Sequence, residues 1–139
     1  MDTTRKETKP GKKQLRIALV GGHERTVRHL IERGKTVGWT IEQHSGEMKG
    51  RGPKSLESQI ARADIVVITT KVNSHGGMFR AKHYARRFGR FTTIIRHENF
   101  SEIENAIIQF KIVENLIRNK TKQLQMIKRQ IWDLKIPLS

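Results

Sequence analysis

The sequence predicts an α/β protein with a parallel sheet of about four strands, flanking helices and a long C-terminal helix. Short apolar runs alternate with segments whose apolar residues recur at helical spacing, which is typical of parallel sheets with right-handed crossovers. The run at residues 65–70 (IVVITT) is apolar almost throughout, as a central strand buried on both faces requires. Residues 103–138 carry apolar side chains at every seventh position, which indicates a helix of coiled-coil type.

The expected elements follow one another along the chain. A polar, basic segment at residues 1–14 is expected to be a disordered arm. A small Rossmann-like domain is expected over residues 15–100, and a long helix for oligomerisation or partner binding over residues 101–139. The predicted elements are a strand at 15–20, a helix at 25–33, a strand at 36–41, a helix that begins at Ser55, a strand at 65–70, a helix at 78–88, a strand at 91–95 and a helix at 101–135.

Local signals set several of these boundaries. Gly34 is expected to stop the first helix and Gly89 the third. Ser55 is expected to cap the second helix, after a glycine-rich basic loop at residues 45–54. Asp64 precedes the strongest strand, at the edge of the sheet opposite to the expected site, so we expect a structural role for it. The predicted strand order is 2-1-3-4.

Four of the six histidines follow apolar strand-like runs. In an open α/β sheet, ligands bind outside the carboxyl ends of the strands, so these histidines are expected to share one edge. Imidazoles there could ligate a metal or, when charged, hold a phosphate. We name the following set the ligand rim: Gly21, Gly22, His23, His44, Ser45, Thr70, Asn73, His75, Arg96 and His97.

The local motifs on this rim leave its ligand open. The Gly21-Gly22 turn precedes a helix N-terminus, which offers free N–H groups to an anion, but it matches neither G-x-G-x-x-G nor a P-loop. A tight turn with no ligand, and histidines that are ordinary loop residues, are the alternative interpretations. No His-x-x-x-His or His-Glu-x-x-His motif is present, so the metal and the cofactor stay unidentified.

Catalytic chemistry is poorly supported. The carboxylates expected near the rim are Glu24, Glu47 and Glu98, and none of them is visibly paired with another. The serines beside histidines lack the G-x-S-x-G turn that an exposed nucleophile would need. We therefore expect no catalytic residues.

Positive charge is the strongest bulk property. The chain has 28 Lys and Arg against 13 Asp and Glu, a formal net charge of +15, and a sequence pI near 10.8. The excess lies in the body as well as the N-terminal segment, which favours a polyanionic partner, with nucleic acid first. The alternative is a protein that simply happens to be basic. The expected contacts to the phosphate backbone are Lys49, Arg51, Lys54, Arg80, Lys82, Arg86, Arg87 and Arg90.

The pattern in the last third of the chain predicts a homo-oligomer or a partner protein bound through the helix. The oligomerisation residues are expected at one heptad position: Ile103, Phe110, Ile117, Leu124 and Ile131. The second heptad position carries Ala106, Val113, Lys120, Ile127 and Leu134, of which Lys120 alone is polar. The front of the helix is expected to pack on its own sheet and the rear to pair with another chain.

Four motifs together resemble an uncharacterised bacterial family of small Rossmann-like domains, a domain of unknown function. They are a strand that ends in Gly21-Gly22, the triplet His44-Ser45-Gly46, the strand that begins Ala63-Asp64, and the Val72–His75 turn before a basic helix. The resemblance covers residues 15–97 and implies the same fold. Relatives often carry a Ser-Arg pair at the end of strand 4, where this chain has Ile95-Arg96.

These observations lead to one hypothesis and two alternatives. We expect a non-catalytic, cytoplasmic, oligomeric protein that binds nucleic acid by its phosphates, since the chain has no cysteine, no apolar leader and no run of membrane length. The first alternative is a small-ligand or metal sensor that uses the rim. The second is a phosphate-handling enzyme.

Overall fold

The computed structural model describes residues 14–134 and divides the chain into two compact units that meet between Ala106 and Ile107. We call the first unit the body. The second unit consists of the remainder of the long helix. The predicted arm, apart from its last residue, lies outside the described residues.

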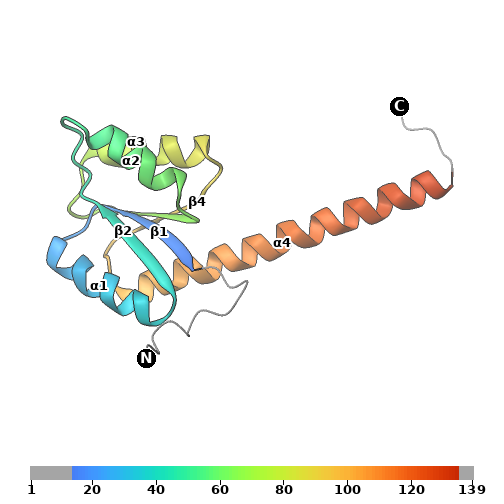
Figure 1. Ribbon diagram of the computed structural model, residues 1–139, viewed down its shortest axis with the longest axis horizontal. Coiled ribbons are helices and arrows are strands. Elements are labelled where there is room, and N and C mark those ends of the chain that lie inside the picture. Colours follow the sequence, from blue (N-terminus) through green and yellow to red (C-terminus); the bar gives the residue numbers. More distant parts are fainter. Residues whose placement is uncertain (1–13, 135–139) are drawn as a thin grey trace, which may run out of the picture. The chain divides into compact units, whose positions relative to one another are not determined.

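The body is a four-stranded parallel sheet with helices on both faces (Figure 1). The strand order is β2-β1-β3-β4, which confirms the predicted order. The α/β fold with a long C-terminal helix is confirmed as well. The elements are β1 (Leu15–Val20), α1 (Glu24–Thr36), β2 (Trp39–His44), α2 (Gly52–Ala61), β3 (Ile65–Thr69), α3 (His75–Arg87), β4 (Phe91–Ile95) and α4 (Phe100–Asp133).

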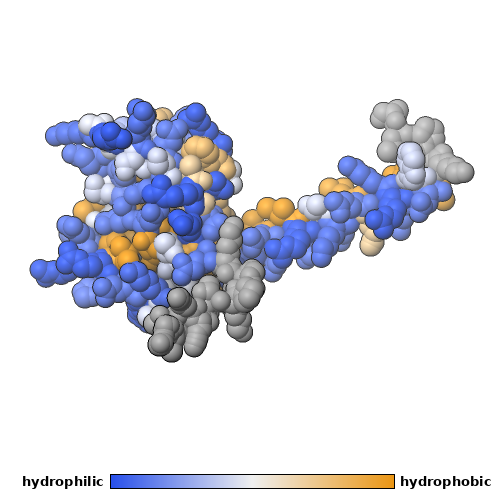
Figure 2. Space-filling view, in the orientation of Figure 1, coloured by the Kyte–Doolittle hydropathy of each residue, from blue (hydrophilic) through white to orange (hydrophobic). Residues whose placement is uncertain are grey.

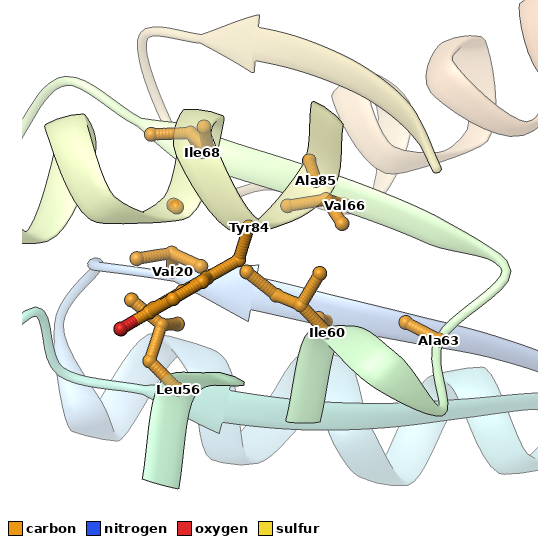
Figure 3. Close-up of a cluster of buried hydrophobic side chains, with 10 residues drawn as sticks. Val20, Leu56, Ile60, Ala63, Val66, Ile68, Tyr84 and Ala85 are labelled. Carbon is orange, nitrogen blue, oxygen red and sulfur yellow. The ribbon is translucent and has the colours of Figure 1, made fainter. Parts of the chain in front are cut away.

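Alternate residues of the central strands point to opposite faces of the sheet. On one face, side chains of β1 and β3 pack against α2 and α3, and Tyr84 lies among Val20, Leu56 and Ile60 (Figure 3). On the other face lies α1, whose Val27 and Leu30 are buried. β3 is buried over its full length, as its apolar sequence predicts.

The start of α4 belongs to the body. Ile103 and Ala106 are buried there, 0% and 2% exposed. Phe100 stacks on Trp39 with ring centroids 4.8 Å apart, and the Arg33 guanidinium lies 3.8 Å above the Phe100 ring. Ile103 is therefore inaccessible to a partner, although it was the first of the predicted oligomerisation residues.

Three local predictions are wrong. Gly34 does not end α1, which continues to Thr36. A Cβ at Gly34 would lie 3.1 Å from Ile41, so this glycine allows close helix–strand packing instead. Ser55 does not cap α2, because the helix begins earlier, at Gly52, with Pro at its start. The second strand begins at Trp39 rather than residue 36, since α1 extends further than expected.

Two other boundary predictions hold. Gly89 follows the C-cap residue of α3, Phe88, and has a left-handed φ of 67°. Asp64 has the expected structural role: its carboxylate accepts a hydrogen bond from the Arg16 N–H at 2.9 Å, and its own N–H donates to the Arg16 carbonyl. Among the described helices, none is long and apolar enough to cross a membrane.

Candidate functional site

The turn between β1 and α1 lies at the carboxyl end of the sheet, where the sequence predicts an anion site. All three backbone N–H groups of its Gly-Gly-His segment have partners within the chain. Gly21 donates to the His44 carbonyl at 2.7 Å, and Gly22 donates to the Val72 carbonyl at 2.9 Å. The His23 N–H donates to the Glu98 carboxylate at 2.7 Å.

Glu98 occupies the place that a bound anion would take. Its side chain is only 6% exposed, and its carboxylate lies at the N-terminus of α1, where the helix dipole favours negative charge. The Gly-Gly turn thus binds an anion from its own chain, supplied by the loop that follows β4. This internal carboxylate leaves less room and less electrostatic attraction for a free phosphate at the same point.

Asn73 fills the space between the first and third loops. Its Nδ2 donates to the Val20 carbonyl at 3.1 Å and to the Thr69 carbonyl at 2.9 Å, while its Oδ1 accepts from the Ser74 N–H. A Cβ at Gly46 would lie 2.2 Å from the Asn73 Oδ1, and a Cβ at Gly21 would lie 2.7 Å from its Nδ2. The space between the carboxyl ends of β1 and β3, where ligands bind in many open α/β sheets, is therefore filled by Asn73 and the neighbouring backbone.

His44 is buried, and the backbone engages both of its ring nitrogens. The Gly46 N–H donates to Nδ1 at 3.0 Å, and Nε2 lies 2.9 Å from the Gly52 carbonyl. Because Nδ1 accepts, the proton belongs on Nε2, which then donates to Gly52. His44 thus joins the loop after β2 to the start of α2, and neither nitrogen is directed at a ligand.

The other rim side chains lie at the surface, apart from Asn73 and the two buried glycines. His23, Thr70, His75, Arg96 and His97 are exposed. Ser45 is exposed too, and its Oγ accepts from the Glu47 N–H at 3.2 Å. Within residues 14–134, no group of three or more His, Asp or Glu side chains could hold a metal ion.

Two residues that hold the rim together were not included in the predicted set. Gln43 donates from Nε2 to the carbonyls of Gly21 and Gly22, at 3.0 and 3.2 Å. Ser74 caps α3 by accepting from the Gly77 N–H, and its hydroxyl donates to the Gly46 carbonyl at 2.6 Å. The sequence offered a signal for Ser74, because a serine directly before a helix is typical of an N-cap.

A second candidate site is the basic surface over α2 and α3. These helices pack side by side, and Arg87 of α3 pairs with Glu57 of α2 at 3.1 Å. Six predicted contacts are exposed and make no ion pair in the part of the chain that the structure describes. We name them the α2–α3 basic face: Lys49, Arg51, Lys54, Arg80, Lys82 and Arg86.

Two predicted nucleic-acid contacts have structural partners instead. Arg90 donates from its guanidinium to the carbonyls of Ile60 and Ala61, at the C-terminal end of α2. Arg87 forms the ion pair with Glu57. Both cations therefore connect α3 and the chain after it to α2, and they are less available to an external anion than the α2–α3 basic face.

A shallow depression of about 410 Å³ lies along α2. Polar and charged residues line it: Arg51, Lys54, Ser55, Glu57, Ser58 and Arg62. Arg62 forms an ion pair with Glu42 at 2.9 Å, and this hydrogen bonding raises the pKa of its guanidinium above the ordinary value. Arg51 and Lys54 are the cations of this depression that have no ion-pair partner among the described residues.

The geometry defines a small Rossmann-like α/β protein whose strand-end loops are bonded to one another, with a separate basic surface. A family model described as "Uncharacterized protein conserved in bacteria (DUF2325)" matches residues 16–110. The chain therefore belongs to this family, in agreement with the resemblance found in its motifs. It is also 33% identical, over 76 residues, to the UPF0751 protein DSY3086 of Desulfitobacterium hafniense (strain Y51), with 55% of this chain and 74% of that protein covered. No solved structure matches the chain.

Proposed function

We propose that this protein binds nucleic acid without catalysis, through phosphate contacts made by the α2–α3 basic face. A single observation carries the proposal: two adjacent helices and the loop before them expose six cations on one layer of the body, and none of the six has an ion-pair partner within residues 14–134. Figure 2 shows that the surface over these helices is predominantly hydrophilic.

The local charge balance supports this choice. Residues 45–90 contain ten Lys and Arg (Lys49, Arg51, Lys54, Arg62, Lys71, Arg80, Lys82, Arg86, Arg87, Arg90) and three acids (Glu47, Glu57, Asp64), so their net charge is +7. Glu57 is already paired with Arg87. A surface of this kind attracts the phosphate backbone irrespective of sequence. A cytoplasmic location belongs to the same proposal, because a chain without cysteine suits a reducing compartment.

The ligand rim is the weaker candidate. Its Gly-Gly turn binds Glu98, and its buried histidine binds the backbone, so the turn that would hold a phosphate is already bonded. The other His and Arg side chains of the rim are exposed on separate loops. The aromatic side chains beside the basic face also fit phosphate contact rather than base stacking. Tyr84 is buried and Phe88 is half-buried in the core between the helices, so Phe79 is the exposed phenyl or phenol ring on α3 that could stack on a base.

The test is fluorescence anisotropy with labelled single- and double-stranded DNA and RNA across about 50–300 mM salt. We expect binding that persists near 150 mM and weakens steeply with salt. The variant Lys54→Gln/Lys82→Gln/Arg86→Gln should lose about tenfold or more in affinity, and its log–log slope should become shallower by about one for each lost phosphate contact.

A matched variant separates this surface from total charge. Arg25→Gln/Arg28→Gln/Lys35→Gln removes the same three charges from exposed positions on α1, which lies on the other face of the sheet. We expect it to change the affinity much less. Equal losses in the two triple variants would reduce the proposal to non-specific attraction, and no binding by the wild type at 150 mM would refute it.

A further inference from the structure

The second unit exposes an apolar stripe along one side of α4. The stripe residues are Val113, Ile117, Lys120, Leu124, Ile127 and Ile131. The four apolar members between residues 113 and 127 are 38–61% exposed, and Figure 2 shows hydrophobic side chains among hydrophilic ones along this helix. Spacing that alternates between three and four residues is that of a helix that packs against another helix. The stripe is thus built for a partner.

We propose that this stripe pairs with the same stripe of a second copy of the chain, in antiparallel orientation. In the register we infer, Val113 lies opposite the partner's Ile131, and Ile117 lies opposite the partner's Ile127. Every stripe residue then meets another stripe residue, over about 27 Å of helix at 1.5 Å per residue. The pairing is independent of nucleic-acid binding.

Lys120 decides between the two orientations. In a parallel, in-register dimer, Lys120 would face the partner's Lys120 inside the interface, which places two ammonium groups together and removes them from water. In the antiparallel register, Lys120 lies opposite the partner's Leu124 instead. Its aliphatic stem can then cover the leucine while its ammonium group reaches solvent at the edge.

The charges that flank the stripe are complementary in the same register. Glu114 and Lys128 both lie at the heptad position that faces itself across an antiparallel pair, so Glu114 meets the partner's Lys128 twice in each dimer. Neither side chain has an ion-pair partner within the described chain, so both are available. Parallel pairing offers Glu114 only the partner's Gln109 and offers Lys128 only the partner's Gln123.

Two neighbouring registers fit less well. A shift of one heptad toward the body would place the partner's Ile131 against Ala106, which is 2% exposed and inaccessible. A shift of one heptad the other way would leave Val113 opposite a position beyond Asp133, where α4 ends. The register that joins Val113 to the partner's Ile131 therefore uses the exposed helix most completely.

Introduced cysteines can test orientation and register together, because the chain has no native cysteine. Two full-length variants, Val113→Cys and Ile131→Cys, would be unfolded, refolded separately or as an equal mixture, and oxidised. We expect a disulfide-linked dimer in the mixture at a yield several times that of either variant alone. Efficient cross-linking of each variant with itself would establish parallel pairing and overturn the proposal.

Analytical ultracentrifugation of the wild-type protein measures its oligomeric state without introduced cysteines, which could disturb the helix. A monomer at tens of micromolar would overturn self-pairing. We expect a dimer whose dissociation constant rises about tenfold in Glu114→Lys and in Lys128→Glu, because each variant replaces two attractive pairs by repulsive ones. The double variant Glu114→Lys/Lys128→Glu should return toward the wild-type value. Failure of this rescue would contradict the antiparallel register.

Discussion

At the scale of single residues, three side chains at the carboxyl edge of the sheet stabilise the turns around them. Glu98 and Asn73 lie in two different loops and His44 ends β2, and each bonds backbone groups of another part of the chain. Parallel strands leave backbone donors and acceptors unpaired where they end, and such groups are costly when buried without partners. These three side chains satisfy them. At these three positions, residue types that suggest a ligand site serve the stability of this edge.

Gly46 provides a test of this closed edge. Gly46 has a φ of 93°, and an added Cβ would lie 2.2 Å from the Asn73 Oδ1. Gly38 has a φ of 86° with no atom within 4 Å of an added Cβ. Urea unfolding should show that Gly38→Ala loses about 1–2 kcal/mol, the cost of a left-handed backbone. Gly46→Ala should lose about 2 kcal/mol more, because the Asn73 side chain must leave its hydrogen bonds.

Both variants force alanine into a left-handed backbone. The difference between their losses in free energy of unfolding therefore reports the contact with Asn73. Similar losses would mean that the loops yield easily at Asn73. In that case the space between β1 and β3 could open for a small ligand, and the rim would return as the stronger candidate site.

At the scale of elements, α2 depends on a cation from outside the helix. Its C-terminal carbonyls lack partners within the helix. That of Ile60 accepts from the Ala63 N–H at 3.2 Å, and Arg90 donates to those of Ile60 and Ala61. We expect Arg90→Gln to lower the free energy of unfolding by about 1–3 kcal/mol. Arg86→Gln, at an exposed position without an ion pair to any described residue, should change the free energy of unfolding by less than about 0.5 kcal/mol.

For nucleic-acid affinity we expect the opposite order: Arg86→Gln should lose more than Arg90→Gln. Arg86 belongs to the α2–α3 basic face, whereas Arg90 is bound to α2. Anisotropy measured below the unfolding transition should therefore show the larger loss for Arg86→Gln. A larger loss for Arg90→Gln in a folded protein would mean that its guanidinium contacts phosphate as well.

The elements themselves could be predicted largely from the sequence. The apolar run of β3 and the βα alternation are properties of neighbouring residues, and they determine a parallel sheet with crossovers of one hand. The strand order was also predicted correctly, although the alternation of strands and helices does not by itself determine it. The prediction at Gly34 failed because a glycine inside a helix signals either a stop or a close contact. The distinction here depends on Ile41, which belongs to another element.

The candidate site could be predicted only in part. The rim residues were assigned to the ends of strands by local pattern. Whether His44 faces solvent or the Gly52 carbonyl depends on where α2 begins, and that boundary was misplaced by three residues. The partnership of Glu98 with His23 joins positions 75 residues apart. Contacts of this kind arise from tertiary packing, which a single sequence does not specify.

At the scale of the whole molecule, nucleic-acid binding and antiparallel pairing together predict that a long nucleic acid is bound by avidity. An antiparallel pair carries two bodies and hence two α2–α3 basic faces. A partner long enough to touch both faces would be bound more tightly than a short one, because the second contact becomes intramolecular. A monomer that binds only through its charge should gain affinity on a longer duplex solely because a longer duplex offers more binding sites.

Ile127→Asp tests this effect, since it places a carboxylate within the stripe, opposite the partner's Ile117, where no cation of the stripe faces it. The site is 50% exposed in the single chain, so the body should fold normally. We expect this variant to be monomeric and to bind a 10-base-pair duplex with nearly wild-type affinity. On a 40-base-pair duplex, about 136 Å long at 3.4 Å per pair, it should bind at least about tenfold more weakly than the wild type. Lys122→Asp, a larger charge change at an exposed position outside the stripe, controls for added negative charge. Equal losses in both variants on the long duplex would show that α4 contributes charge and not a second body.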